Sequence, residues 1–281
     1  MRILDVVFVY QMKREEEIKW HGRYHKHGPN EFEIHYFIQG NGSFINGDCR
    51  HVINPGRLFF TFPLQFHSII ADDLNHPISY YAILFSIDPE KEEAHELLLN
   101  YMESGKFYDI GTKNRFFFEE IKEKGMSDHV FLRKSAEYQF LSFLYQLSDG
   151  LQRFNYGAES NHHIEKALRI LQNSVMGDLK LCDLARKLDL NESYLVRLFK
   201  KKMSLTPMKY YRKLKVEAAS SMLINTEMPI YTISQKLNFY SEFHFSKIFK
   251  QFTGLSPTQY RKNYFQYIGE EARKPDTIAS K

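Results

Sequence analysis

The sequence predicts two domains, an antiparallel β-barrel followed by an all-α domain, and three observations support this division. Short apolar runs separated by turn residues occupy residues 32–85, and a unit with a spacing of 50 residues is repeated within residues 185–260. The third observation is charge: residues 1–160 carry 17 Lys and Arg against 23 Asp and Glu, and residues 161–281 carry 21 against 11. A net charge of −6 followed by one of +10 indicates that only the second part meets a polyanion.

Composition excludes several classes of protein. With 281 residues, 43% of them hydrophobic and 26% charged, the chain is neither collagen-like nor disordered. Its two cysteines, Cys49 and Cys182, are too few for a disulfide framework. No run of 18 apolar residues is present, and the N-terminal MRILDVVFVYQMKREEE has no small-residue cleavage site. We therefore expect a first strand at the N-terminus, no membrane partner and a cytoplasmic location.

The barrel is predicted from five short segments rich in Phe, Tyr and Ile, which suit a half-buried pleated surface. These segments are residues 32–40, 42–45, 49–53, 57–62 and 78–85. Asn46-Gly47 is typical of a two-residue hairpin turn, and Pro55-Gly56 and Pro63 mark further turns. Short strands without helical periodicity between them indicate an antiparallel sandwich or small barrel.

Polar side chains gather on this predicted barrel. Seven of the twelve histidines lie in it: His21, His25, His27, His35, His51, His67 and His76. Because strand residues two apart share a face, His25 and His27 point to the same side. By the same rule one face of the segment 32–40 carries Glu33, His35, Phe37 and Gln39, and the other carries Phe32, Ile34, Tyr36 and Ile38.

These residues resemble a known family. His25-x-His27, Glu33 and Gly40, followed by Pro55-Gly56 and Pro63-x-x-x-His67, are similar to the cupin jelly roll, in the variant that serves as the sensor domain of AraC-type regulators. The resemblance implies that the face with Glu33 points into the barrel. A small polar effector would then be held by six side chains: His25, His27, Glu33, Gln39, His67 and Tyr80.

A metal is the other ligand that two histidines and a glutamate can hold in such a barrel. The sequence departs from the cupin metal pattern, since five residues separate His27 from Glu33 and Arg57-Leu58-Phe59 stands where a histidine is usual. His67 comes much later in the chain. We therefore expect no metal and no cofactor, and regard the histidines as pocket lining or as surface and structural residues of the barrel.

The segment after the barrel is predicted to be helical. Helices are expected over residues 89–102, 114–125 and 128–148, and residues 151–163 are the best linker candidate. The last helix has an apolar stripe at helical spacing, made by Leu132, Ala136, Phe140, Phe143, Leu144 and Leu147. This stripe either packs on the barrel or meets the same helix of a second copy in a homodimer.

The second half contains one unit used twice. Residues 194–210 align with residues 244–260 with five identities in 17 positions, and ARKL ending at Leu188 matches SQKL ending at Leu237 after a one-residue shift. Each copy therefore predicts a short helix, a tight turn and a second helix, with Asn191 and Ser241 as caps of the second helices. A continuous helix over about residues 207–223, with Pro207 in its first turn, would separate the two copies.

The second helix of each copy has an apolar face and an outward polar face that ends in cations. The outward residues are Glu192, Ser193, Val196, Arg197 and Lys200 in the first copy, and Glu242, Phe243, Ser246, Lys247 and Lys250 in the second. The major groove of DNA admits such a helix, with side chains for base edges and cations for phosphates. The pattern is that of a helix-turn-helix, present twice.

Here the resemblance to a family is specific. Phe239, the run Phe245-Ser246-Lys247-Ile248-Phe249-Lys250, Gly254-Leu255-Ser256-Pro257 and Tyr260-Arg261 are similar to the signature of the AraC/XylS family of transcription regulators. Two departures are Asn238, where the family usually has glycine, and Phe243, where a small polar residue is usual. Asn tolerates left-handed backbone, so we expect the turn to persist. The resemblance implies activation through contact with RNA polymerase.

The resulting prediction is a sequence-specific regulator that binds double-stranded DNA as a homodimer and responds to an effector. Its expected domains are a cupin-like sensor barrel at 1–112, a helical dimerisation and linker segment at 113–160, a double helix-turn-helix domain at 161–265 and a polar tail at 266–281. A metal-dependent cupin enzyme docked to nucleic acid is the alternative. The sequence supports the enzyme less than the regulator, because no nucleophile–base constellation occurs and Cys182 is predicted to be a core residue.

Overall fold

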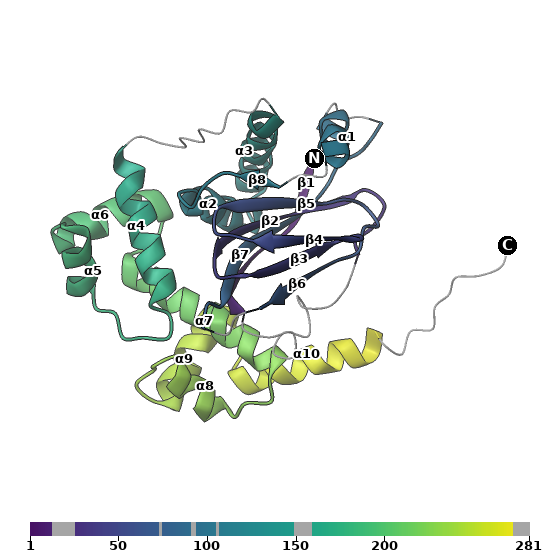
Figure 1. Cartoon of the computed structure of the whole chain (residues 1–281). Coiled ribbons are helices and arrows are strands. Elements are labelled where there is room, and N and C mark those ends of the chain that lie inside the picture. Colours follow the sequence, from purple (N-terminus) through teal and green to yellow (C-terminus); the bar gives the residue numbers. More distant parts are fainter. Residues whose placement is uncertain (13–25, 73–74, 91–93, 105–106, 149–158, 272–281) are drawn as a thin grey trace. The chain divides into compact units, whose positions relative to one another are not determined.

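The structure is a computed structural model that describes residues 1–12, 26–72, 75–90, 94–104, 107–148 and 159–271 (Figure 1). The chain divides into two compact units. The first unit comprises Met1–Ile170 with Lys201–Ser204, and the second comprises Leu171–Lys200 with Leu205–Lys281. Among the described residues, no helix is long and apolar enough to cross a membrane.

The first unit contains two antiparallel sheets, which confirms the predicted β domain (Figure 1). The larger sheet has the order β1 (Arg2–Met12), β7 (Ile78–Ser86), β2 (Glu31–Gln39), β5 (Arg57–Thr61) and β8 (Tyr108–Asp109). The smaller sheet has the order β4 (Cys49–Ile53), β3 (Gly42–Asn46) and β6 (His67–Ala71). The sequence did not predict β6 and β8 as strands.

The hairpin between β3 and β4 is displaced by one residue from its prediction. Asn46 pairs with Cys49 and therefore belongs to the strand, so the two turn residues are Gly47 and Asp48. Gly47 has φ 59°, whereas the amide of Asn46 donates to the carbonyl of Phe60 at 2.8 Å. This side-chain hydrogen bond joins Asn46 of the smaller sheet to β5 of the larger sheet.

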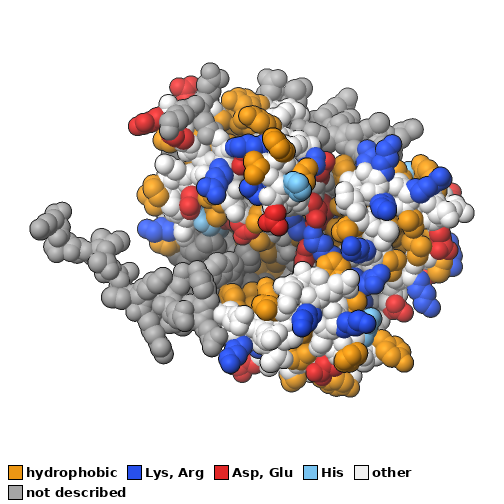
Figure 2. Space-filling model, turned by 180° about the vertical axis from the view of Figure 1, so that it is seen from behind, with side chains coloured by type: hydrophobic (Ala, Val, Ile, Leu, Met, Phe, Trp, Pro, Cys, Tyr) orange, Lys and Arg blue, Asp and Glu red, His pale blue; other side chains and the backbone are white. Residues whose placement is uncertain are grey.

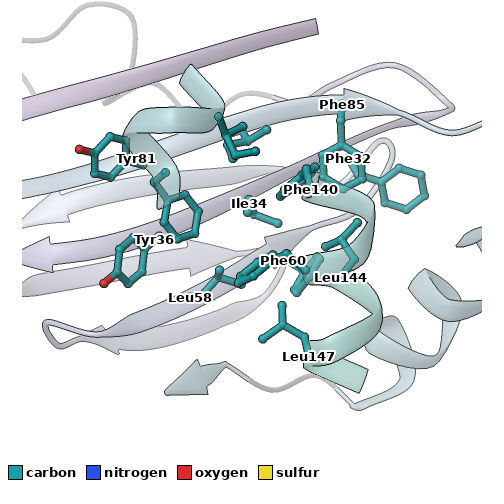
Figure 3. Packing of buried hydrophobic residues seen from close by; sticks show 14 of the residues in the cluster. Phe32, Ile34, Tyr36, Leu58, Phe60, Tyr81, Phe85, Phe140, Leu144 and Leu147 are labelled. Atoms are coloured by element: carbon teal, nitrogen blue, oxygen red, sulfur yellow. The ribbon is translucent and has the colours of Figure 1, made fainter. Parts of the chain in front are cut away.

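Helices cover one face of the larger sheet. They are α1 (Ala94–Ser104), α2 (Arg115–Gly125) and α3 (Val130–Ser148), and their apolar residues form one core with Phe32, Ile34 and Tyr36 of β2. Figure 3 shows side chains of the strands directed toward Phe140, Leu144 and Leu147 of α3. The predicted stripe of α3 therefore packs on the barrel, except that Leu132 is 43% exposed.

The opposite face of β2 lies between the two sheets. Phe37 and Tyr80 of the larger sheet share a second core with Phe44 and Ile69 of the smaller sheet. Strand alternation thus assigns Glu33 and His35 to this interior, because they stand four and two residues before Phe37. One face of β2 therefore packs on the apolar helices. The other face, which carries the predicted effector residues, lines an interior of polar and aromatic side chains between the two sheets.

The second unit is helical and shows the repeat directly. Helix α4 (Glu159–Asn173) begins in the first unit and ends in the second. The further helices are α5 (Leu181–Leu188), α6 (Glu192–Met203), α7 (Pro207–Asn225), α8 (Ile230–Lys236), α9 (Glu242–Thr253) and α10 (Pro257–Glu271). The predicted linker lies partly outside the described residues, and its last part, 159–163, is helical.

The turns of the two copies repeat as well. Asp189 and Asn238, which precede the second helix of each copy, have φ 55° and 51°. Ser204 and Gly254, which follow it, have φ 58° and 78°. Left-handed backbone at matching positions is what a repeated helix-turn-helix requires, and Asn238 accommodates it in place of glycine.

Candidate nucleic-acid interface and polar centre

Helices α6 and α9 begin at matching caps. The side-chain oxygen of Asn191 accepts from the backbone N–H of Ser193 at 2.9 Å, and the hydroxyl of Ser241 accepts from that of His244 at 3.1 Å. Each cap satisfies an amide that the helix itself leaves unpaired. Both predicted caps are therefore present, and they determine where the two outward faces begin.

The inner faces of the two helices anchor them in the unit. Leu195 and Phe199 of α6 are fully buried, as are Phe245 and Phe249 of α9. Leu198, which was also predicted to be buried, is half-buried. These residues recur at helical spacing, so they fix the rotation of each helix about its axis. The remaining side chains are consequently held outward.

The outward faces contain the predicted DNA-binding residues. Eight of the ten are exposed, while Val196 and Ser246 are half-buried at the edge of each face. Lys and Arg side chains recur over the surface of the second unit, with apolar side chains among them (Figure 2). Phe243 is 80% exposed and offers only an apolar contact, such as one with a thymine methyl group.

A buried lysine stabilises the turn of the second helix-turn-helix. The ammonium of Lys215 on α7 donates to the carbonyls of Gly177, Leu237 and Asn238, at 2.8, 2.7 and 3.5 Å. It also lies 4.8 Å from the ring centroid of Tyr211. Because Leu237 and Asn238 form the turn before α9, Lys215 ties that turn to the helix that joins the two copies. Nothing in the sequence distinguished it from a surface lysine.

The stability of the second unit should depend on pH through Lys215. Burial lowers the pKa of its amine from 10.5 to about 8, although Asp178 acts in the opposite direction. From about pH 8 to 10.5 the unfolded chain keeps a proton that the folded chain releases, so the free energy of unfolding should rise with pH. Urea unfolding at pH 7.5, 8.5 and 9.5 measures this slope. Lys215→Met should reduce it; an equal slope in both proteins would contradict the assignment.

The interior of the barrel contains a polar centre, formed by His27, Glu33, His35 and His67. One carboxylate oxygen of Glu33, Oε2, lies 2.9 Å from Nε2 of His27, 2.9 Å from Nε2 of His67 and 3.3 Å from Nε2 of His35. All but His27 are at least nine-tenths buried. Residues from β2, β6 and the segment before β2 thus meet at one atom.

The charge state of Glu33 follows from these neighbours. Burial raises the pKa of its carboxyl, but the charge of His35 and hydrogen bonds from His27 and His67 hold it well below 4.5. Glu33 is therefore ionised. Burial and the Glu33 charge together raise the pKa of Tyr80, whose ring centroid is 5.8 Å from that of His35. Tyr80 is consequently a neutral hydroxyl group at the edge of the centre.

Sequence reasoning missed two members of this site. His35 was assigned to the face but not to the ligand set, although it stands two residues after Glu33. Thr61 lies opposite Glu33 in the pairing of β5 with β2 and is fully buried. Its hydroxyl has no hydrogen-bond partner among the described residues. Thr61 therefore adds a buried hydroxyl to the face of the sheet that carries Glu33.

The structure does not test one of the predicted effector residues, and it places another away from the centre. His25 lies outside the described residues. Gln39 is at the far end of β2, six residues from Glu33, a separation of roughly 20 Å along a strand. His27, Glu33, His67 and Tyr80 are the four that the fold brings together.

Cys182 is exposed, so the prediction that it is a core residue is wrong. It is the second residue of α5, and this helix turns Leu184, Ala185 and Leu188 inward instead. Cys49, on β4, is exposed as well.

The N-terminus of α2 is capped from another helix. Glu165 of α4 accepts from the backbone N–H groups of Arg115 and Phe116 at 2.9 and 2.7 Å. Asn114, at the cap position, uses its side chain elsewhere, donating to the carbonyl of Ile110. The guanidinium of Arg115 donates to the carbonyl of Ile38 at the end of β2. Strand β2, α2 and α4 are thus linked by hydrogen bonds within the first unit.

Comparison with known proteins agrees with both the β domain and the helix-turn-helix domain. Residues 10–103 match the AraC-like ligand binding domain family, and residues 184–263 match a helix-turn-helix domain family. The raffinose operon transcriptional regulatory protein of Pediococcus pentosaceus is 25% identical over 240 residues, covering 83% of this chain and 86% of the relative. The msm operon regulatory protein of Streptococcus mutans is also 25% identical over 240 residues, covering 83% and 84%. The transcriptional activator RhaR of Mannheimia succiniciproducens is 24% identical, covering 86% and 88%.

Proposed function

Because the chain belongs to the AraC family of DNA-binding transcription regulators, we propose that each subunit reads two adjacent major-groove segments of DNA with α6 and α9, under the control of a small polar effector. The observation that carries this proposal is the exposed cationic face repeated on both helices. The two copies also have matching caps at the start of their second helices and left-handed residues at matching turn positions. Arg197 and Lys247 occupy equivalent positions in them.

Helix α7 supports simultaneous use of both copies. It runs uninterrupted over Pro207–Asn225, with the hydroxyl of Thr206 capping its start. Consecutive major-groove segments on one face of DNA are about 34 Å apart, so a rigid connector is suited to hold two reading helices one turn apart. Selection of bound duplexes from a random pool with the purified chain tests this. Enrichment of two short motifs about one helical turn apart supports the proposal, and a single motif contradicts it.

The effector in this proposal is a polyhydroxylated molecule of the sugar class that binds at the polar centre. Imidazoles and a carboxylate offer both donors and acceptors to hydroxyl groups, and aromatic rings of Phe37, Phe44 and Tyr80 pack beside them. Two relatives that this chain matches over more than four-fifths of their length are named as regulators of a raffinose operon and of an msm operon. We propose the sensor to lie within residues 1–112, and the DNA-binding domain within 161–265.

Removing a single hydroxyl group next to the polar centre should weaken effector binding. In calorimetric titrations with raffinose and with lactose, we expect Tyr80→Phe and Thr61→Val to weaken binding by about 5- to 30-fold each, the effect of one lost hydrogen bond in a buried site. Gln39→Ala is the matched control and should bind as the unchanged chain does. Equal affinities in all four proteins would place the effector elsewhere.

We also propose a homodimer that forms through the outer face of α3. Phe131, Tyr138 and Tyr145 follow one another at seven-residue spacing and are 86%, 71% and 42% exposed. Residues seven apart return to nearly the same side of a helix, so the three rings form one stripe, opposite the face packed on the barrel. Exposed aromatic stripes of this kind are characteristic of protein interfaces.

The double substitution Phe131→Glu, Tyr138→Glu should convert the dimer to a monomer. Two buried charges at an interface core cost several kcal/mol, so we expect dimer affinity to fall by at least about 100-fold. Sedimentation velocity at micromolar concentration measures this. Val52→Glu, a charge placed on an exposed apolar residue of β4, is the control that should leave the mass unchanged. A monomer in the unsubstituted chain would disprove the proposal.

The remaining parts of the proposed function are activation of transcription through contact with RNA polymerase and action in the cytoplasm. A relative named as a transcriptional activator supports the first. Transcription in vitro from a selected operator, with and without the purified chain, distinguishes activation from repression.

A further inference from the structure

We propose that the polar centre is a binding site for one divalent transition-metal ion, with Nε2 of His27, Nε2 of His67 and a carboxylate oxygen of Glu33 as ligands and water in the remaining positions. The proposal shares the interior of the barrel with the effector site of the proposed function and adds a cation to it. The absence of a metal was expected because His67 lies far along the chain. Strand β6 nevertheless brings its ring to Glu33.

The geometry is that of a coordination sphere. One ligand atom from each of His27, Glu33 and His67 lies within 4.8 Å of the other two. Transition-metal ions bind imidazole nitrogen and carboxylate oxygen at about 2.0–2.2 Å, so neighbouring ligands of one ion are roughly 2.8–3.6 Å apart. The distances from Oε2 of Glu33 to Nε2 of His27 and to Nε2 of His67, both 2.9 Å, fall in this range.

Hydrogen bonds within the polar centre explain the arrangement of these side chains less well than a bound cation does. A carboxylate oxygen has about two acceptor sites, whereas three imidazole nitrogens approach the same oxygen of Glu33. Beside it, Thr61 buries a hydroxyl that finds no partner among the residues described. A cation bound between the imidazoles and the carboxylate, with its water molecules, would give the hydroxyl of Thr61 an acceptor.

The donor set selects the class of ion. Mg²⁺ and Ca²⁺ require predominantly oxygen ligands, while imidazole together with carboxylate suits Zn²⁺, Fe²⁺, Co²⁺ and Ni²⁺. The group supplies two imidazole nitrogens and one carboxylate oxygen. Both described cysteines are exposed and lie outside it, so no thiolate takes part.

Cobalt titration of the whole chain, freed of metal by chelation, tests the proposal. We expect one Co²⁺ per chain with a visible absorption spectrum of nitrogen and oxygen ligation, and displacement of Co²⁺ by Zn²⁺. His67→Ala and Glu33→Gln should weaken Co²⁺ binding by at least roughly 100-fold, since even outer-shell changes cost 10- to 100-fold. The double variant His162→Ala, His163→Ala removes a neighbouring pair of histidines on α4 and should bind as before.

X-ray absorption of the Zn²⁺-loaded unsubstituted chain makes the test independent of whether variants fold. Two or three imidazoles and an oxygen at about 2.0–2.2 Å support the site. No stoichiometric binding of Co²⁺ or Zn²⁺, or binding that only the His162 and His163 variant loses, overturns it. DNA binding is measured on the same metal-free samples: specific binding without any metal uptake would remove this inference and leave the proposed function intact.

Discussion

Substituting both Arg197→Ala and Lys247→Ala should remove most sequence-specific DNA binding. The two residues occupy equivalent positions on α6 and α9 and are exposed, while the opposite faces of these helices are buried. A side chain that contacts a base edge contributes about 1–3 kcal/mol of discrimination, so we expect a loss of roughly 30-fold to 10⁴-fold for the selected operator. Fluorescence anisotropy with that operator and with a scrambled duplex, at fixed salt, provides the measurement.

Lys200→Ala with Lys250→Ala is the matched comparison, because it removes the same charge one turn further along each helix. As phosphate contacts, these lysines should weaken operator and scrambled duplex alike and lower the salt slope by about 1.8. The Arg197→Ala, Lys247→Ala variant should instead reduce the ratio of the affinity for the operator to the affinity for the scrambled duplex. If both double variants keep the operator affinity of the unsubstituted chain, neither α6 nor α9 reads DNA.

The DNA-binding part was accessible from sequence because its determinants are local. Caps such as Asn191 and Ser241 act within three residues, and buried positions such as Phe199 and Phe249 recur at helical spacing. A repeat doubles each of these signals, and helices α6 and α9 begin 50 residues apart, as the alignment requires. In the same way, strict alternation along β2 separated its two faces, and the family resemblance assigned the face with Glu33 to the interior.

What the sequence could not provide are contacts between segments far apart in the chain. His67 reaches Glu33 only because β6 pairs with β3, and HSIIA shows no alternation of polar and apolar residues that would predict a strand. Thr61 became part of the site through its pairing across β5 and β2. Lys215 reads as a solvent-exposed charge until the carbonyls of Gly177 and Leu237 are placed beside it. Such pairings depend on tertiary structure, which periodicity does not contain.

A further long-range contact bears on how the proposed effector binding would be transmitted to the DNA-binding unit. Strand β2 carries Glu33 on its interior face, and the carbonyl of Ile38 near its end accepts from Arg115. The backbone of Arg115 in turn donates to Glu165 of α4, the helix that continues into the second unit. A change in β2 therefore has a short hydrogen-bonded route to α4, through the N-terminus of α2.

We expect Glu165→Gln to break this route. A glutamine has one acceptor oxygen in place of two, so only one of the Arg115 and Phe116 amides keeps its partner, and the favourable charge at the start of α2 is lost. Loss of one charge-assisted hydrogen bond costs about 1.5–3 kcal/mol, which corresponds to roughly 10- to 150-fold faster exchange of the released amide. Hydrogen exchange read by mass spectrometry over residues 115–125, together with the thermal unfolding of the chain, measures both effects.

The same substitution should separate effector binding from its effect on DNA. The polar centre is untouched, so affinity for the effector should stay within about twofold, while the effector-dependent change in operator affinity should fall toward zero, because a ligand shifts an equilibrium only by its differential affinity for the two states. Lys166→Gln, on the next residue of α4 and exposed, is the control and should respond fully. A Glu165→Gln chain whose operator affinity still responds fully to effector would show that the signal bypasses the α2 N-terminus.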